Sequence, residues 1–93
     1  MPDFRVFETD EFLKQLKKLP PDDAKFLQAK LDAFVYPQIK QEPFWGNNIK
    51  KLRDYNPGTW RYRIGKFRLF YIIDQEEQII YVLTVEKRKD AYR

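Results

Sequence analysis

A short strand and a helix account for the apolar positions at the start of the chain. Phe4 to Phe7 is a β-prone run and predicts an edge strand. Thr9 or Asp10 can cap the next element, a helix, and the Pro20-Pro21 pair ends it. The apolar positions of this helix recur at helical spacing: Phe12, Leu13, Leu16 and Leu19.

The same spacing predicts a second helix, which Asp22 or Asp23 can cap and which ends at the Tyr36-Pro37 pair. Its apolar stripe contains Ala24, Leu27, Leu31 and Phe34/Val35. Two helices joined by a short turn make a helical hairpin. From Pro37 to Asn48 the chain has prolines, a glycine and an Asn pair without periodicity, so this segment connects the helices to the rest of the domain.

The remaining residues are predicted to form strands separated by turns. The expected strands are Ile49 to Tyr55, Thr59 to Ile64, Phe67 to Ile73, and Ile79 to Val85. Gly65-Lys66 has the length and composition of a two-residue hairpin turn. The chain therefore predicts a single α+β domain over residues 1–93, with an N-terminal strand, a helical hairpin and an antiparallel β-meander, the helices packed on one face.

The hairpin around Gly65-Lys66 is predicted to have two unlike faces. A two-residue turn pairs Arg63 with Arg68 and Arg61 with Phe70. Alternation then places a set of large apolar side chains toward the helices: Trp60, Tyr62, Ile64, Phe67, Leu69, Tyr71 and Ile73. The opposite face carries Arg61, Arg63, Arg68, Phe70 and Ile72. Among the aromatic residues, Trp45, Tyr62 and Tyr71 are assigned to packing.

Three arginines on one hairpin face are costly unless something compensates them. Like charges directly across two strands destabilise a sheet by several tenths of a kcal/mol. One compensation is a set of nearby carboxylates, for which the candidates are Asp54, Glu76, Glu77 and Glu86. The other is an external anion, since arginine forks suit phosphate oxygens. With Lys87-Arg88-Lys89 next in the tail, the pattern favours a polyanionic partner.

Composition supports this interpretation and excludes several others. Residues 1–48 carry seven Lys/Arg against eight Asp/Glu, and residues 49–93 carry eleven against six. Cysteine and histidine are absent, which excludes disulfides, thiolate chemistry and imidazole ligands. No apolar run is long enough to span a bilayer, and the N-terminus does not resemble a signal peptide. We therefore expect a cytoplasmic protein without a metal, a cofactor or a membrane partner.

Two segments of the chain resemble a known family, the RelE/ParE toxin superfamily. They are Trp60 to Tyr71, WRYRIGKFRLFY, and Val85 to Tyr92, VEKRKDAY. The order of strand, helical hairpin and meander is also that of the superfamily. The resemblance implies a toxin of a toxin–antitoxin system with a cognate antitoxin as partner. In the RelE branch the toxin is an endoribonuclease that cleaves mRNA on the ribosome.

Matching by motif, the resemblance places the reaction on five residues: Arg61, Arg63, Arg68, Arg88 and Tyr92. Further RNA contacts are expected from Lys66, Phe70, Lys87 and Lys89. The implied reaction is attack of a ribose 2′-OH on the adjacent phosphate, without a metal. Lysines of the RelE branch are replaced here by Arg61 and Arg63, which stay protonated, so the general base is not evident. Electrostatic stabilisation can carry most of the rate instead, or Glu86 or Tyr92 can assist.

Two alternatives remain beside the nuclease. The ParE branch shares the hairpin pattern but inhibits DNA gyrase, and Arg88 with Tyr92 favours the nuclease over it. A non-catalytic RNA-binding module would use the same basic face. A branch with a glutamate and histidine pair does not fit, because the chain has no histidine and has Asn47-Asn48 at the corresponding place.

Overall fold

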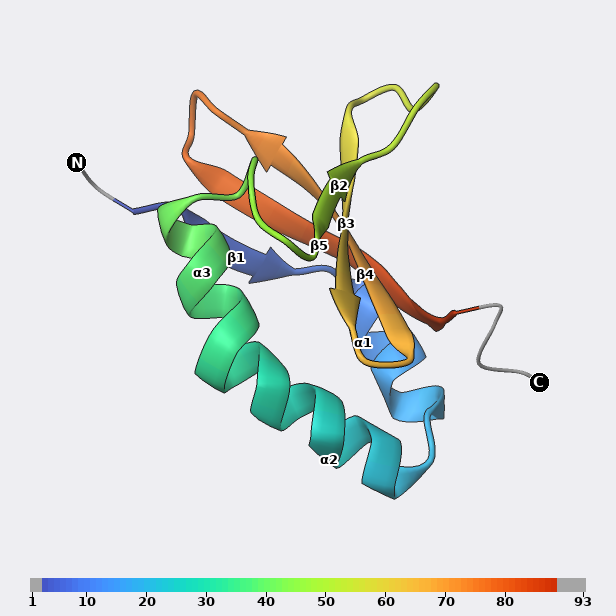
Figure 1. Cartoon of the computed structure of the whole chain (residues 1–93). Helices are drawn as coiled ribbons and strands as arrows, with labels where there is room; N and C mark the ends of the chain where they lie inside the picture. Colours follow the sequence, from blue (N-terminus) through green and yellow to red (C-terminus); the bar gives the residue numbers. More distant parts are fainter. Residues whose placement is uncertain (1–2, 89–93) are drawn as a thin grey trace.

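The fold has two layers, a five-stranded sheet and a set of helices on one of its faces (Figure 1). The computed structural model describes residues 3–88. The strands are β1 (Arg5–Glu8), β2 (Ile49–Lys51), β3 (Thr59–Ile64), β4 (Phe67–Asp74) and β5 (Ile79–Lys87). They lie in the order β1-β5-β4-β3-β2. Strands β2 to β5 form the predicted antiparallel meander, and the α+β fold class is confirmed.

Strand β1 lies at the edge of the sheet, as predicted, but it runs parallel to β5. This pairing joins the start of the described chain to its last strand. The sequence predicted the strand but not its pairing with β5, because the local sequence of an edge strand does not specify which strand it pairs with. Strand β5 also continues past the predicted Val85, to Lys87.

Helix α1 (Asp10–Lys18) begins at one of the two predicted caps, Thr9. The Phe12 backbone N–H donates to Thr9 Oγ1 at 3.2 Å, and the Thr9 hydroxyl donates to the Val82 carbonyl at 2.8 Å. Thr9 therefore satisfies an otherwise unpaired N–H of the first helical turn and fastens the helix to β5. Phe12 is the residue of α1 that is completely buried.

The second helical segment differs from its prediction at both ends. It begins with Pro21 as the first residue of α2 (Pro21–Lys30) and has no side-chain cap, so the expected Asp22 or Asp23 cap is wrong. Proline suits this position because its missing N–H would be unpaired there anyway. Both aspartates lie in the first turn, where negative charge favours the helix dipole.

Pro37 does not end this helix, contrary to the prediction. A π-helical turn, η1 (Leu31–Val35), precedes it, and α3 (Tyr36–Gln41) comes directly after that turn. The Tyr36 N–H donates to the Leu31 carbonyl, five residues back. This wider turn precedes a proline that cannot donate to the backbone, and the helix continues past it. The connection to the sheet is therefore shorter than predicted, residues 42–48.

Strand β2 is also shorter than expected, ending at Lys51 instead of Tyr55. The Leu52 N–H still donates to the Thr59 carbonyl at 2.8 Å, after which the chain leaves the sheet. Asp54 has a left-handed backbone with φ of 62°, which breaks the extended conformation. Residues 52–58 consequently form a loop beside the sheet.

The hairpin register and its buried face are confirmed. Arg63 is the partner of Arg68, and Arg61 the partner of Phe70. The residues expected to face the helices form one cluster with buried residues of all the helical segments, including Phe12, Leu27, Leu31, Val35 and Ile39. Tyr71 is completely buried, and its hydroxyl donates to the Pro43 carbonyl at 2.6 Å.

Two aromatic residues that were candidates for packing in the interior are exposed. Trp45 is 75% exposed, so its assignment to packing is wrong. Its neighbour Phe44 makes the contact instead, with its ring centroid 5.5 Å from that of Trp60. Phe34 is 61% exposed, while the adjacent Val35 fills the core. Successive residues point in different directions, so only one of each pair can enter the interior.

Candidate functional site

The face of the β3–β4 hairpin turned away from the helices carries the predicted arginines. We call this face the outer face; Arg61, Arg63, Arg68 and Phe70 lie on it. Arg63 and Arg68 are direct cross-strand partners, so their charges are forced together by the register. The guanidinium carbon of Arg68 lies 5.8 Å from the centre of the Phe70 ring. The short turn thus concentrates positive charge beside one aromatic ring.

Arg88 joins these residues from the end of β5. Its backbone N–H donates to the Lys66 carbonyl at 2.8 Å, and its Nη1 donates to the Gly65 carbonyl at 3.1 Å. Gly65 adopts the left-handed φ of 57° that the tight turn requires. The turn therefore positions Arg88 beside the hairpin. We call Arg61, Arg63, Arg68 and Arg88 the arginine cluster.

The pKa of Arg61 responds to its burial and to the other three charges of the cluster. Burial lowers the pKa of Arg61 from its ordinary value, and the charges of Arg63, Arg68 and Arg88 lower it further. The Nε atoms of Arg61 and Arg68 are buried and have no hydrogen-bond partner within residues 3–88. Buried N–H groups of this kind are normally paired, so these two unpaired donors add to the cost of the cluster within the fold.

The sequence left open that nearby carboxylates, and not an external anion, compensate the arginines, and one arginine does have such a partner. Arg68 Nη2 donates to Glu86 Oε1 at 2.6 Å. Compensation by a local carboxylate therefore applies to Arg68. Within the part of the chain that the structure describes, Arg61 and Arg63 form no ion pair with a carboxylate. Local acids thus compensate the cluster only in part.

Two predicted lysines lie away from the cluster. Lys66 Nζ is 3.2 Å from Asp23 of α2, toward the helices. Lys87 is the cross-strand partner of the buried Phe67, so its place in β5 is on the helix-facing side. The other two predicted residues, Lys89 and Tyr92, lie outside the described residues. The structure thus brings together the arginines and Phe70, and separates Lys66 and Lys87 from them.

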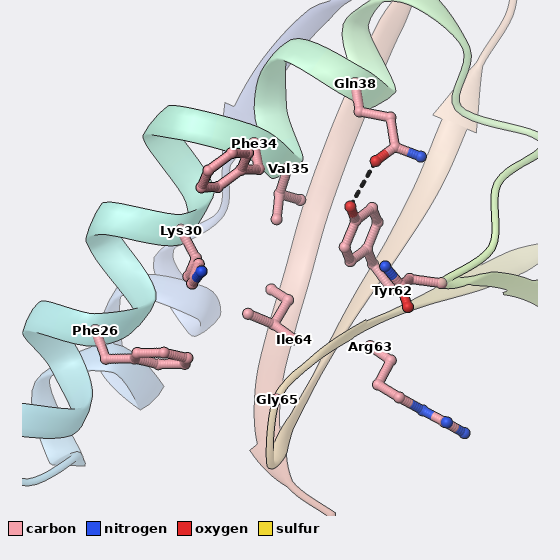
Figure 2. Close-up of a pocket in the computed structure, with 10 residues that line it drawn as sticks. Phe26, Lys30, Phe34, Val35, Gln38, Tyr62, Arg63, Ile64 and Gly65 are labelled. Atoms are coloured by element: carbon pink, nitrogen blue, oxygen red, sulfur yellow. Dashed lines mark hydrogen bonds between the residues drawn. The ribbon is translucent and has the colours of Figure 1, made fainter.

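A groove on the opposite side of the hairpin was not predicted (Figure 2). It has a volume of about 390 Å³ and lies between the α2–η1 helix and β3. Lys30 Nζ lies 5.9 Å from the Phe26 ring centre and 5.0 Å from that of Phe34. In Figure 2 the Arg63 side chain extends away from these residues. Arg63 is nevertheless among the residues that line the groove, so the groove borders the outer face at that residue.

Residues 3–88 contain no group of three acidic, histidine or cysteine side chains that could hold a metal ion. No helix in the same range is long and apolar enough to cross a membrane. The outer face itself offers guanidinium groups that bind anions, together with one carboxylate and aromatic surface.

Comparison with known families now identifies the group to which the chain belongs. The model of the family described as ParE toxin of type II toxin–antitoxin system, parDE, matches residues 6–92. The chain belongs to this toxin family. It is also 33% identical over 90 residues to a relative named toxin RelE1 in Methanocaldococcus jannaschii, covering 97% of this chain and 96% of the relative. Toxin RelG of Mycobacterium tuberculosis is 36% identical over 80 residues, 86% of this chain and 85% of RelG.

Solved structures agree with this assignment. The toxin–antitoxin complex RelBE2 from Mycobacterium tuberculosis contains a chain with a TM-score of 0.73 and 32% identity, covering 95% of this chain and 94% of that one. An archaeal RelE–RelB complex from Pyrococcus horikoshii shares the fold, with a TM-score of 0.69, 20% identity and coverage of 94% and 97%. The RelE/ParE resemblance expected from residues 60–92 is confirmed, and the protein is a toxin of a toxin–antitoxin system.

Proposed function

We propose that this toxin is a RelE-type endoribonuclease that cleaves mRNA on the ribosome without a metal ion. The observation that carries the proposal is the arginine cluster, in which the register forces Arg63 and Arg68 together and in which Arg61 and Arg63 lack carboxylate partners within residues 3–88. An RNA backbone supplies the missing acceptors, since phosphate oxygens accept from guanidinium forks. The relatives named RelE1 and RelG favour the RelE branch.

The reaction begins with attack of a ribose 2′-OH on the neighbouring phosphorus. The O2′–P bond forms, the P–O5′ bond breaks, and the products are a cyclic phosphate and a free 5′-OH. The 2′-OH loses a proton and the leaving oxygen gains one. Negative charge accumulates on the phosphate oxygens as the bonds change. Preorganised cations that contact those oxygens stabilise the transition state more than the ground state.

Charge stabilisation, in this proposal, carries most of the rate. Arginine remains protonated near neutral pH even where its pKa is lowered, so the cluster supplies no general base. Glu86 pairs with Arg68, so the carboxylate that the structure places at the cluster is already held there. Solvent accepts the 2′-OH proton. Tyr92, in the tail, stays a predicted catalytic residue.

The proposed partner that controls this activity is a cognate antitoxin. Relatives have been solved as toxin–antitoxin complexes, among them RelBE2 of Mycobacterium tuberculosis. A basic outer face and an open edge at β1 or β2 offer two ways to bind such a protein, by acidic contacts and by strand addition. Covering the arginine cluster would block RNA at the same time.

The decisive experiment incubates the toxin with translating ribosomes and maps the new ends of the messenger. The proposal expects fragments with a 5′-OH and a cyclic phosphate, formed in the Mg²⁺ concentration that keeps the ribosomes intact. A 5′-phosphate at the new ends would refute attack by the 2′-OH. DNA breaks that depend on gyrase would instead identify a ParE-type inhibitor, and RNA binding without cleavage would identify a non-catalytic module.

A further inference from the structure

A second feature of the outer face is a pocket beside the arginine cluster. It is lined by Tyr55, Thr59, Phe70, Leu83, Thr84 and Glu86 and has a volume of about 260 Å³. The residues come from the loop after β2 and from three neighbouring strands. We call it the outer pocket. None of the residues predicted from the sequence to bind RNA lines it except Phe70.

Two residues that line the outer pocket, Phe70 and Glu86, also lie beside the arginine cluster. Phe70 is the cross-strand partner of both Arg61 and Thr84, and it also lies beneath the Arg68 guanidinium. Glu86 is the cross-strand partner of Arg68 and its ion-pair partner. A phosphate bound by the arginines would therefore lie next to the opening of this pocket.

The chemistry of the walls suits a nucleobase better than a second phosphate. Glu86 would repel an anion inside the pocket. A base is neutral and offers an apolar face, which stacks on aromatic side chains in single-stranded RNA complexes. Phe70 and Tyr55 provide such surfaces, and Tyr55 is 58% exposed, on a loop, where its ring is accessible.

The polar groups of the pocket can read the edge of that base. The Thr59 hydroxyl donates to the Pro57 carbonyl at 3.1 Å, so toward a ligand it acts as an acceptor. A carboxylate accepts hydrogen bonds and donates none, and Glu86 has a second oxygen besides the one that holds Arg68. These acceptors match the exocyclic amino groups of adenine and cytosine, which uracil lacks.

We propose that the outer pocket binds the nucleobase adjacent to the phosphate held by the arginine cluster, and that it prefers bases with an exocyclic amino group. This inference rests on the proposed RNA-cleaving function, because that function places the phosphate. It adds a base-recognition site to a surface whose other contacts, to phosphate, carry no sequence information.

Binding can be measured separately from cleavage with fluorescent single-stranded hexamers of 2′-O-methyl A, C or U, which lack the attacking hydroxyl. Wild-type toxin should bind the A and C hexamers more tightly than the U hexamer. Tyr55→Ala should weaken binding of the A and C hexamers roughly tenfold through loss of stacking, while Tyr55→Phe keeps it. Thr84→Phe, which fills the pocket, should weaken it similarly. Trp45→Ala is the matched control, since Trp45 is an exposed aromatic that does not line the pocket.

Circular dichroism of each variant separates lost binding from lost folding. Wild-type affinity in folded Tyr55→Ala and Thr84→Phe would overturn the inference, as would variants that lose affinity for an antitoxin but not for RNA. If the toxin binds the hexamers through Tyr55 yet cleaves no messenger, the nuclease proposal fails and the base pocket stands. If it cleaves messenger and these variants cleave and bind normally, only the base pocket fails.

Discussion

The two faces of the β3–β4 hairpin are built from alternate residues of the same stretch of chain, yet one is buried and apolar and the other is charged. The helix-facing side contains Tyr62, Ile64, Phe67, Leu69 and Tyr71, each exposed by 5% or less. The outer face gathers arginines whose charges repel one another, and the buried Nε atoms of Arg61 and Arg68 lack partners among the described residues. One face therefore stabilises the fold, and the other carries charge that the fold alone does not compensate.

The difference between the two faces shows how a small protein can present a costly site. The strands are held by a continuous apolar face and by a backbone ladder, neither of which depends on the outer side chains. A repulsive pair worth several tenths of a kcal/mol is tolerable beside buried aromatic residues that contribute several kcal/mol each. Substitutions on the helix-facing side should therefore reduce stability, and substitutions on the outer face should reduce cleavage while sparing the fold.

The largest expected effect is on the stability of the helix-facing side. Phe67→Ala removes a completely buried ring that packs against Phe26, and it should lower the free energy of unfolding by about 3–5 kcal/mol. Urea denaturation followed by circular dichroism measures this. A loss below about 1 kcal/mol would show that the hairpin is not the centre of the core.

Arg68→Gln should instead spare the fold and reduce cleavage. If its guanidinium stabilises the phosphorane-like transition state, the rate should fall by about 10²–10³, or about 2.7–4 kcal/mol. The change in stability should be about 1 kcal/mol or less, since the lost ion pair with Glu86 is exposed. Arg5→Gln, an exposed strand arginine on β1, is the control. Equal rates for the two variants would place the site elsewhere.

Alkaline pH should lower the free energy of unfolding, because of tyrosines that are buried between the sheet and the helices. Burial raises the pKa of Tyr71 above its ordinary value of 10.0, so the folded state retains a proton that the unfolded state loses. The contribution of Tyr71 to the free energy of unfolding is fully present below pH 10, and it is lost as the pH rises further. One pH unit above this point the loss should be about 1 kcal/mol.

Tyr36 should contribute in the same direction. Its pKa is raised by burial and by its hydrogen bond to Glu8, whose Oε2 lies 2.6 Å from the tyrosine hydroxyl. Denaturation at about pH 9 and about pH 11, compared with Tyr36→Phe and Tyr71→Phe, measures both contributions. A wild-type stability that is equal at the two pH values would contradict the assignment.

The smallest expected effect on stability is that of Arg63→Gln. Because Glu86 already neutralises part of the Arg68 charge, relief of the cross-strand repulsion should raise stability by only a few tenths of a kcal/mol. The gain should shrink in high salt, which screens exposed charges. Cleavage should nevertheless fall, as for Arg68→Gln. Unfolding of Arg63→Gln would show instead that this arginine is structural.

The class of the fold, the two faces of the hairpin and the family could all be predicted from the amino-acid sequence. Period-two alternation on either side of Gly65-Lys66 was enough to pair Arg63 with Arg68, because a two-residue turn leaves one register. The Thr9 cap could be expected for the same reason: it depends on residues close in sequence.

Features that depend on contacts between distant segments required the tertiary structure. The parallel pairing of β1 with β5, the passage of a helix through Pro37, and the choice of Val35 and Phe44 over Phe34 and Trp45 are of this kind. The same is true of the ion pair that Glu86 gives to Arg68, and of the outer pocket that Tyr55 closes from a loop. Local sequence sets periodicity and turns, but it leaves open which of several suitable side chains reaches a partner, because packing across the whole domain settles that choice.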